Sequence, residues 1–397
     1  MATLAEHQAN RALLRDLRAR GLPSDLEQAD KLQTLYHARE MEGIADDVYD
    51  AAKGESQPEP GWLRASEHLD ELREVAPQLR DISDDQLREY LKPRESGFRA
   101  EIYIPDAAIL GPGYKPVISV KGSSGEVLDA HAPGGKRDTT MEDFLANNFP
   151  QSVGLESDYY TRGMSLAKQL HDRGFDFELS AHSLGGGVVS AMSAVSGKRA
   201  TTWNSAGLHP ETVQRFAANN RGVKTFDTNN LVIAYMVQGE LLNDGIQKNI
   251  DRLDSYRNYQ LAGVLKETSQ LLQSLPEGRA LFKSGLDNAF PPSSPAYARD
   301  AVSAFVDKLA YGNTAQLLRE LPLAAGTMKP ALSAMTEQQG RFVKRVQTQT
   351  LADTSNFAGP ILSTLHATAL GAHTGRQAGE LVATGGKIVG ASAGRFR

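Results

Sequence analysis

The chain has 397 residues, of which 40% are hydrophobic, and its formal net charge is −5. This length corresponds to one large domain or to two or three ordinary domains with a sizeable core, and the charge excludes nucleic-acid binding by bulk electrostatics. Because the chain contains no cysteine, disulfides, thiolate nucleophiles and cysteine-bound metals are excluded.

The first residues lack the charged and then apolar pattern of a secretory signal peptide. No run of eighteen apolar residues occurs, so no transmembrane helix is expected. If the protein leaves the cell, it would need a specialised secretion system that uses no cleavable signal peptide. The alternative is a cytoplasmic protein.

The first 95 residues predict a helical region. Apolar residues recur three and four positions apart over 9–18 and 26–52, which is the spacing of one helix face. Residues 56–61 predict a linker because they contain two prolines and a glycine, and Pro93 ends the last helix.

The pattern then changes to strands that alternate with helices. Residues 98–105 and 115–121 predict a hairpin, with a Gly-Pro-Gly turn at 111–113. The elements expected after the hairpin are helices at 141–148 and 157–172 and strands at 199–204 and 231–237. Such alternation is typical of an α/β fold with parallel crossovers.

The segment FELSAHSLGGG at 177–187 predicts a strand, a tight turn and a helix of small residues. This is the layout of a nucleophile elbow, in which a sharp turn exposes the hydroxyl of a serine, here Ser183. Ala181 and Gly185 flank the serine where the turn leaves little room. Ala181 stands where glycine is usual, and alanine tolerates strained backbone less well. The alternative is a glycine-rich turn that binds a phosphate or does no chemistry.

Strand signals disappear from about residue 241 to residue 360. Residues 261–275 and 298–321 predict amphipathic helices, with a proline-rich loop at 291–295 between them. These helices could cover the core in the ordinary way or form a surface that contacts a membrane. The final residues, 371–397, are rich in glycine and alanine.

Five blocks of sequence resemble, in order, those of the class 3 (fungal-type) lipase family of α/β-hydrolases. The blocks are GFRAEIY (97–103), VISVKGSS (117–124), EDFLANN (142–148), AHSLGG (181–186) and TWNSAGL (202–208). The resemblance covers about residues 40–245 and is greater to bacterial lipase-like proteins with a helical N-terminal region. That group includes phospholipase effectors used against rival bacteria. Lys121 departs from the family, which has arginine in its Arg-Gly-Thr motif.

The resemblance implies an α/β-hydrolase fold in three parts. These are a helical N-terminal region over 1–95, a hydrolase core over 96–245, and a helical lid or cap with the C-terminal segment over 246–397. The last part would carry the catalytic histidine.

The resemblance also implies a catalytic triad whose nucleophile is Ser183. In this fold the serine is followed first by the acid and then by the histidine, so histidines before Ser183 are eliminated, and so is His209. His182 lies inside the elbow and should point away from the nucleophile. Two candidates remain for the base. His366 lies in an apolar helical run, whereas His373 lies in a loop-like frame, where related enzymes carry the base, and is therefore preferred.

Glu240 is the candidate acid, because it follows the strand at 231–237 where the family has an aspartate. Its role would be to orient the imidazole and to stabilise the imidazolium. Asp244 is the alternative acid, and either carboxylate could instead be a solvated residue at a strand end.

The oxyanion hole should use two backbone N–H groups. One belongs to Leu184, directly after the nucleophile, and the resemblance places the other at Ser123, in the loop after an earlier strand. No cofactor and no metal is expected, because no cluster of histidine and acidic residues has the spacing of a metal site.

Together these residues imply a serine lipase or phospholipase that hydrolyses acyl esters of glycerophospholipids. The resemblance further suggests a secreted effector toxin that attacks the membranes of competitor cells and a cognate immunity protein in the producer. The alternatives are a small-ester hydrolase, an acyltransferase, and a catalytically inactive hydrolase fold that serves as a binding module.

Overall fold

A computed structural model gives the structure of residues 3–130, 132–236, 242–243, 250, 255–292 and 294–329. The α-helices are α1 (Leu4–Arg20), α2 (Pro23–Lys53), α3 (Leu69–Val75), α4 (Asp84–Leu91), α5 (Ala107–Leu110), α6 (Phe149–Ser152), α7 (Asp158–Asp172), α8 (Ser183–Ser196), α9 (Pro210–Asn219), α11 (Ser255–Ser274), α12 (Pro276–Ala289), α13 (Ala296–Tyr311) and α14 (Thr314–Arg319). The strands are β1 (Trp62–Arg64), β2 (Ala100–Pro105), β3 (Val117–Val120), β4 (Glu126–Leu128), β5 (Lys136–Asp138), β6 (Glu178–His182), β7 (Ala200–Trp203), β8 (Val232–Tyr235) and β9 (Thr327–Lys329). Three short 3-10 helices, η1 (Pro77–Leu79), η2 (Pro133–Gly135) and η4 (Thr228–Asn230), and one π-helix, η3 (Glu142–Asn148), complete the elements.

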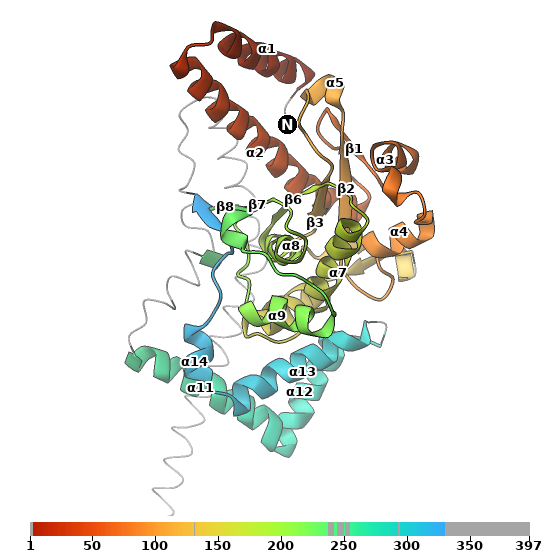
Figure 1. Ribbon diagram of the computed structural model, residues 1–397. Helices are drawn as coiled ribbons and strands as arrows, with labels where there is room; N and C mark the ends of the chain where they lie inside the picture. Colours follow the sequence, from red (N-terminus) through yellow and green to blue (C-terminus); the bar gives the residue numbers. More distant parts are fainter. Residues whose placement is uncertain are drawn as a thin grey trace, which may run out of the picture.

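Seven strands form one mixed sheet in the order β1-β2-β3-β6-β7-β8-β9 (Figure 1). The strand pairs β1–β2 and β2–β3 are antiparallel, so the predicted hairpin is confirmed. Every later neighbour runs parallel, from β3 and β6 to β8 and β9. Because parallel neighbours require crossover segments, this topology confirms the predicted α/β fold.

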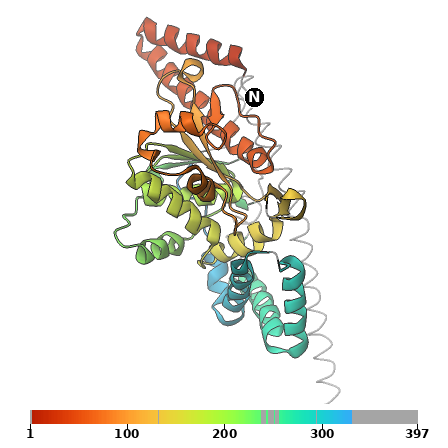
Figure 2. The same ribbon diagram turned by 90° about the vertical axis from the view of Figure 1, so that its right-hand side faces the viewer.

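Helices cover both faces of the sheet, which lies between α2 and α7 in Figure 2. Side chains of α7 and α8 join those of α3 and α4 in the larger core on one face. On the other face α2 packs against strand residues that include Val117, Trp203 and Tyr235. The rings of Trp203 and Tyr235 stack with their centroids 4.5 Å apart. Both faces of the sheet are therefore withdrawn from water, as parallel strands require.

The sequence of α2 explains its place on the sheet. Its residues Ala38, Met41, Ile44 and Ala45 are three or four positions apart, so they share one face, and all four are buried in the core under the sheet. The helix begins at Pro23, where a missing backbone N–H costs no hydrogen bond, and Gly54 caps its end in the left-handed conformation.

One strand lies within the region that was predicted to be helical. Residues 62–64 form β1, which pairs with β2 and extends the sheet at its edge. The expectation of helices alone for residues 1–95 is therefore wrong at this point. A strand of three residues is too short for an alternating pattern, and its pairing with β2 is a tertiary contact that local sequence does not encode.

The helices α11 to α14 form an insertion between β8 and β9, which are neighbours in the sheet (Figure 1). Helix α11 confirms the helix predicted at 261–275, whereas the helix predicted at 298–321 forms two helices, α13 and α14, and α12 was not predicted. Phe290, Ala298 and Val302 pack with Ala146 of η3, so the insertion is joined to the rest of the structure through this π-helix. The expectation of no strand after residue 241 is wrong, because Thr327–Lys329 forms β9.

None of the described helices is both long enough and apolar enough to cross a bilayer.

Candidate active site

The turn between β6 and α8 has the backbone of a nucleophile elbow. β6 ends at His182, and Ser183 begins α8 with a φ of 56° in the left-handed region. Among the described residues, Ser183 and Asn204 are the two non-glycine residues with a positive φ. Such backbone costs on the order of 1–3 kcal/mol and persists where the surrounding structure enforces it, commonly at functional sites.

Ala181 does not strain the elbow. Its φ is not positive, and its side chain is fully buried in the core under α8. The departure from glycine at this position therefore costs no backbone strain, since the strained residue is Ser183 itself.

The glycines after Ser183 are required by close packing. A Cβ atom at Gly185 would lie 2.1 Å from the carbonyl oxygen of Val120, and one at Gly187 would lie 2.1 Å from the hydroxyl of Tyr160. A Cβ atom at Gly186 would lie 2.9 Å from the Cβ of Ser205. The first turn of α8 can therefore lie against β3, the loop at Ser205 and Tyr160 of α7 only because these residues have no side chains.

Replacing Gly185 with alanine is expected to lower the free energy of unfolding by about 3 kcal/mol, because the clash is with backbone that cannot rotate away. Gly263 in α11 is the matched control, since an added Cβ there meets nothing within 4 Å. Gly263→Ala should raise the free energy of unfolding by up to about 1 kcal/mol through helix propensity. Urea denaturation followed by circular dichroism measures both, and equal stability of the two variants would contradict the packing described.

Two histidines near the elbow have structural partners. The Nδ1 atom of His182 lies 3.0 Å from the hydroxyl of Tyr49 on α2, on the opposite face of the sheet from α8. His209 caps α9, where its ring accepts a hydrogen bond from the backbone N–H of Glu211. These contacts agree with the prediction that His182 points away from the nucleophile.

The loop that follows β3 lies beside the elbow because β3 and β6 are parallel neighbours. A Cβ atom at Gly122 would lie 2.7 Å from the carbonyl oxygen of His182, so only glycine permits this approach. Ser123 is buried, and its hydroxyl accepts a hydrogen bond from Asn148 at 3.1 Å. Leu184 is also buried and lies in the first turn of α8, where backbone N–H groups have no intrahelical acceptor. The structure thus brings together the segments of Ser123, Ser183 and Leu184.

A buried ion pair lies under this loop. The Nζ atom of Lys121 is 2.8 Å from Oδ2 of Asp143, and both side chains are 0% exposed. Burial is the largest influence on both groups: it raises the pKa of Asp143 to about 6 and lowers the pKa of Lys121. The opposite charge of each group acts against this effect and favours the ionised pair.

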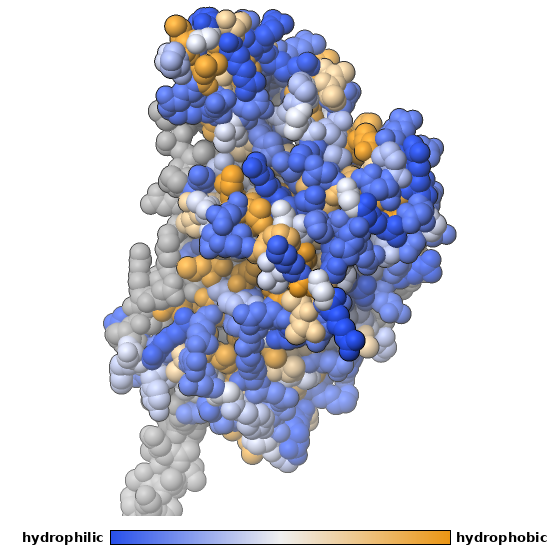
Figure 3. Space-filling model, in the orientation of Figure 1, coloured by the Kyte–Doolittle hydropathy of each residue, from blue (hydrophilic) through white to orange (hydrophobic). Residues whose placement is uncertain are grey.

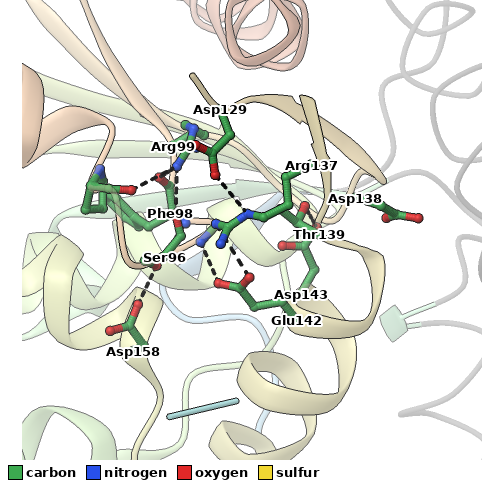
Figure 4. A network of polar contacts seen from close by, with 12 residues as sticks. Ser96, Phe98, Arg99, Asp129, Arg137, Asp138, Thr139, Glu142, Asp143 and Asp158 are labelled. Carbon is green, nitrogen blue, oxygen red and sulfur yellow. Dashed lines mark hydrogen bonds and ion pairs between the residues drawn. The ribbon is translucent and has the colours of Figure 1, made fainter. Parts of the chain in front are cut away.

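Further charged residues extend this polar network towards the insertion (Figure 4). The guanidinium of Arg137 lies between Asp129 and Glu142, with N···O distances of 3.5 and 3.7 Å. Tyr297 of α13 donates a hydrogen bond to Glu142. The π-helix η3 therefore contacts the loop after β3 on one side and the insertion on the other.

Sequence reasoning missed Asp143, Asn148 and Tyr49. Asp143 and Asn148 lie within the EDFLANN block at 142–148. The sequence identifies this block, but it does not indicate that Asp143 binds Lys121 or that Asn148 binds Ser123. Four of the predicted site residues, Glu240, Asp244, His366 and His373, lie outside the described residues. Their roles stay predictions.

A largely apolar cavity of about 780 Å³ lies beside β8 and β9. Its lining includes Leu208, Val213, Phe226, Met236 and Leu323. Figure 3 shows hydrophobic side chains gathered in the centre of the face that carries α9. The loop at 204–208 connects the cavity with the elbow, because Leu208 lines the cavity and the N–H of Ala206 donates to the carbonyl oxygen of Ser183 at 2.9 Å.

In a comparison with protein families, residues 40–285 match a model described as "Phospholipase-like: Tle-like phospholipase domain". A comparison with curated proteins finds no match. The matched range contains Ser123, Ser183 and Glu240 and ends before His366 and His373.

Proposed function

The chain belongs to the Tle-like phospholipase domain family, and we propose that it hydrolyses acyl ester bonds of glycerophospholipids with Ser183 as the nucleophile. The observation that carries this proposal is the strained backbone of Ser183 at the end of β6, inside the matched range. A serine hydroxyl on such a turn is accessible to a substrate while its backbone is held by the sheet and by α8.

The proposed reaction is acyl transfer in two steps. Ser183 attacks the ester carbonyl while a histidine, His373 or His366, takes the hydroxyl proton and then gives it to the leaving alcohol. In the second step the same histidine accepts a proton from water as the water attacks the acyl-enzyme, and it returns this proton to the Ser183 oxygen as the fatty acid leaves. Glu240, or Asp244 in its place, would orient the imidazole.

The backbone N–H groups of Ser123 and Leu184 are proposed to bind the oxyanion in both steps. Support comes from the position of Gly122 against the end of β6, which places the loop after β3 next to the first turn of α8. Each donor fixed on the developing charge contributes roughly 2.7–4 kcal/mol to catalysis.

The apolar cavity beside β8 and β9 supports the proposal that the substrate carries a long hydrocarbon chain. Its volume of about 780 Å³ lies within the usual range for pockets that bind small molecules, roughly 300–1,000 Å³. Apolar walls favour an acyl chain, because burying each CH₂ group contributes about 0.8 kcal/mol.

The biological role that we propose is that of a secreted effector toxin. Family membership supports it, since the family name refers to type VI lipase effectors. We propose that a specialised secretion system exports the protein, that its targets are the membranes of competitor cells, and that the producer makes an immunity protein. Membership of the class 3 lipases, which the order of the five sequence blocks supports, is part of the same proposal.

Expression of the chain in bacteria tests the toxin role. Directed to the periplasm with a fused signal peptide, the wild-type protein is expected to stop colony formation, because phospholipid hydrolysis would breach the membrane. Ser183→Ala, expressed to the same level in the periplasm, should leave growth unchanged. Normal growth of cells that contain active, folded wild-type enzyme in the periplasm would rule out the toxin role.

A further inference from the structure

The buried pair under the oxyanion loop binds backbone rather than substrate. Lys121 and Asp143 are both 0% exposed, so neither can contact a lipid directly. Besides Asp143, the ammonium group of Lys121 lies within hydrogen-bond distance of the carbonyl oxygens of Gly122 at 3.0 Å and Ser124 at 3.2 Å and of the Thr139 hydroxyl at 3.2 Å. A buried lysine whose partners are loop carbonyls must fix the conformation of that loop.

The hydrogen bond from Lys121 to the carbonyl oxygen of Gly122 acts on the peptide that carries the proposed oxyanion donor, the N–H of Ser123. The carbonyl group of Gly122 and the N–H group of Ser123 belong to the same peptide unit. Because a trans peptide is planar, its C=O and N–H point in opposite directions. Lys121 binds the Gly122 carbonyl oxygen at 3.0 Å. It therefore keeps the Ser123 N–H pointing away from the lysine, on the opposite side of the peptide bond from the carbonyl group. No backbone carbonyl of the described residues accepts a hydrogen bond from this N–H.

Asp143 fixes the next peptide unit. Its Oδ2 atom accepts hydrogen bonds from Lys121 at 2.8 Å and from the backbone N–H of Ser124 at 3.0 Å. Its Oδ1 atom accepts from the hydroxyl of Tyr159 at 2.8 Å, and Tyr159 is buried in the main core. The carboxylate thus ties the loop to the helix α7.

We propose that the Lys121–Asp143 pair positions the Ser123 N–H and strengthens it as an oxyanion donor. The proposal rests on the proposed acyl-transfer function of Ser183. A positive charge on the carbonyl side of a peptide polarises it and makes its N–H a better donor, and such polarisation is strong where the dielectric constant is low. Both residues are positioning residues, since they act through the peptide between Gly122 and Ser123.

The test is a double variant, Lys121→Met/Asp143→Asn, which removes both charges together and so leaves no unpaired buried charge. Turnover of p-nitrophenyl butyrate should show a kcat about 10- to 100-fold below wild type, as expected for a misplaced oxyanion donor. KM should change by less than about twofold, because the donor acts mainly on the transition state. Lys121→Arg, which keeps the charge, should retain most of the kcat.

Asp47→Asn is the matched control. Asp47 is also buried, and the hydrogen bonds that it accepts come from Ser56, Gln57 and Tyr103, none of which belongs to the loop after β3. This variant should keep the wild-type kcat even where its stability is lowered. A kcat loss in Asp47→Asn equal to that of the double variant would overturn the proposal, because it would show a general effect of lost stability.

A folded double variant with wild-type kcat would overturn the proposal directly. If the double variant does not fold, Lys121→Gln/Asp143→Asn decides, since it removes both charges and keeps side chains that can hydrogen-bond to the loop. It should lower kcat with KM unchanged, and an unchanged kcat would contradict the proposal. Failure of the proposed function is distinguishable, because the wild-type protein would then turn over no ester and no fluorophosphonate probe would label Ser183.

Discussion

Ser183→Ala is expected to lower kcat for ester hydrolysis on the order of 10⁴-fold or more, which is the scale of loss when a triad nucleophile is removed. The reason is that alanine leaves no group to form the acyl-enzyme. The fold should remain, because the strain at a φ of 56° is a property of the turn and the glycines that let the first turn of α8 pack closely are unchanged. Turnover of p-nitrophenyl butyrate, with circular dichroism of both proteins, measures the effect.

Ser190→Ala is the matched control for this variant. Ser190 lies on the same helix, is fully buried, and donates its hydroxyl to the carbonyl oxygen of Gly186. Its loss removes a hydrogen bond of about 1 kcal/mol and should leave kcat unchanged. Activity that survives Ser183→Ala and disappears in Ser190→Ala would mean that the elbow does not carry the nucleophile.

One of the two late histidines is expected to be the general base. His373→Ala should lower kcat on the order of 10⁴-fold, because the Ser183 hydroxyl would have no proton acceptor. His366→Ala should then retain most of its activity. The reverse result would keep the triad and reassign the base to His366. Both variants are compared with wild type by p-nitrophenyl butyrate turnover and by the rate of fluorophosphonate labelling.

His209→Ala is the control for the order of triad residues along the chain. Its ring caps α9 by accepting from the N–H of Glu211, and burial lowers its pKa. Loss of this cap should cost about 1 kcal/mol of stability and little activity. If His209→Ala were inactive while both late histidine variants were active, the predicted order of serine, acid and histidine would be wrong for this chain.

The elbow could be predicted from sequence because its causes are local. Ser183 and Leu184 are followed by three glycines, and the structure shows that packing against Val120, Ser205 and Tyr160 requires each of them. The strands β2, β3, β7 and β8 were also predicted, because their buried residues form short apolar or alternating runs between turn residues.

Contacts between distant segments could not be predicted. Lys121 and Asp143 are 22 residues apart, and nothing in either segment indicates that the two side chains meet in the core. Lys121 was recognised only as a departure from arginine. The structure shows why a cation is needed there, since its partners are a carboxylate, two carbonyl oxygens and the Thr139 hydroxyl. The strands β1 and β9 were missed for the same reason, because each is three residues long and depends on its partner strand.

Release of free fatty acid from phospholipid vesicles tests the central claim most directly. Wild type and Ser183→Ala would be incubated with vesicles of phosphatidylethanolamine and phosphatidylglycerol, and fatty acid and lysophospholipid quantified by mass spectrometry. The proposed function predicts equal amounts of fatty acid and lysophospholipid from wild type and neither product from the folded Ser183→Ala variant. Folded wild-type protein that releases no fatty acid from vesicles would contradict phospholipid hydrolysis. Inactivity on short esters as well would leave a hydrolase fold that serves as a binding module.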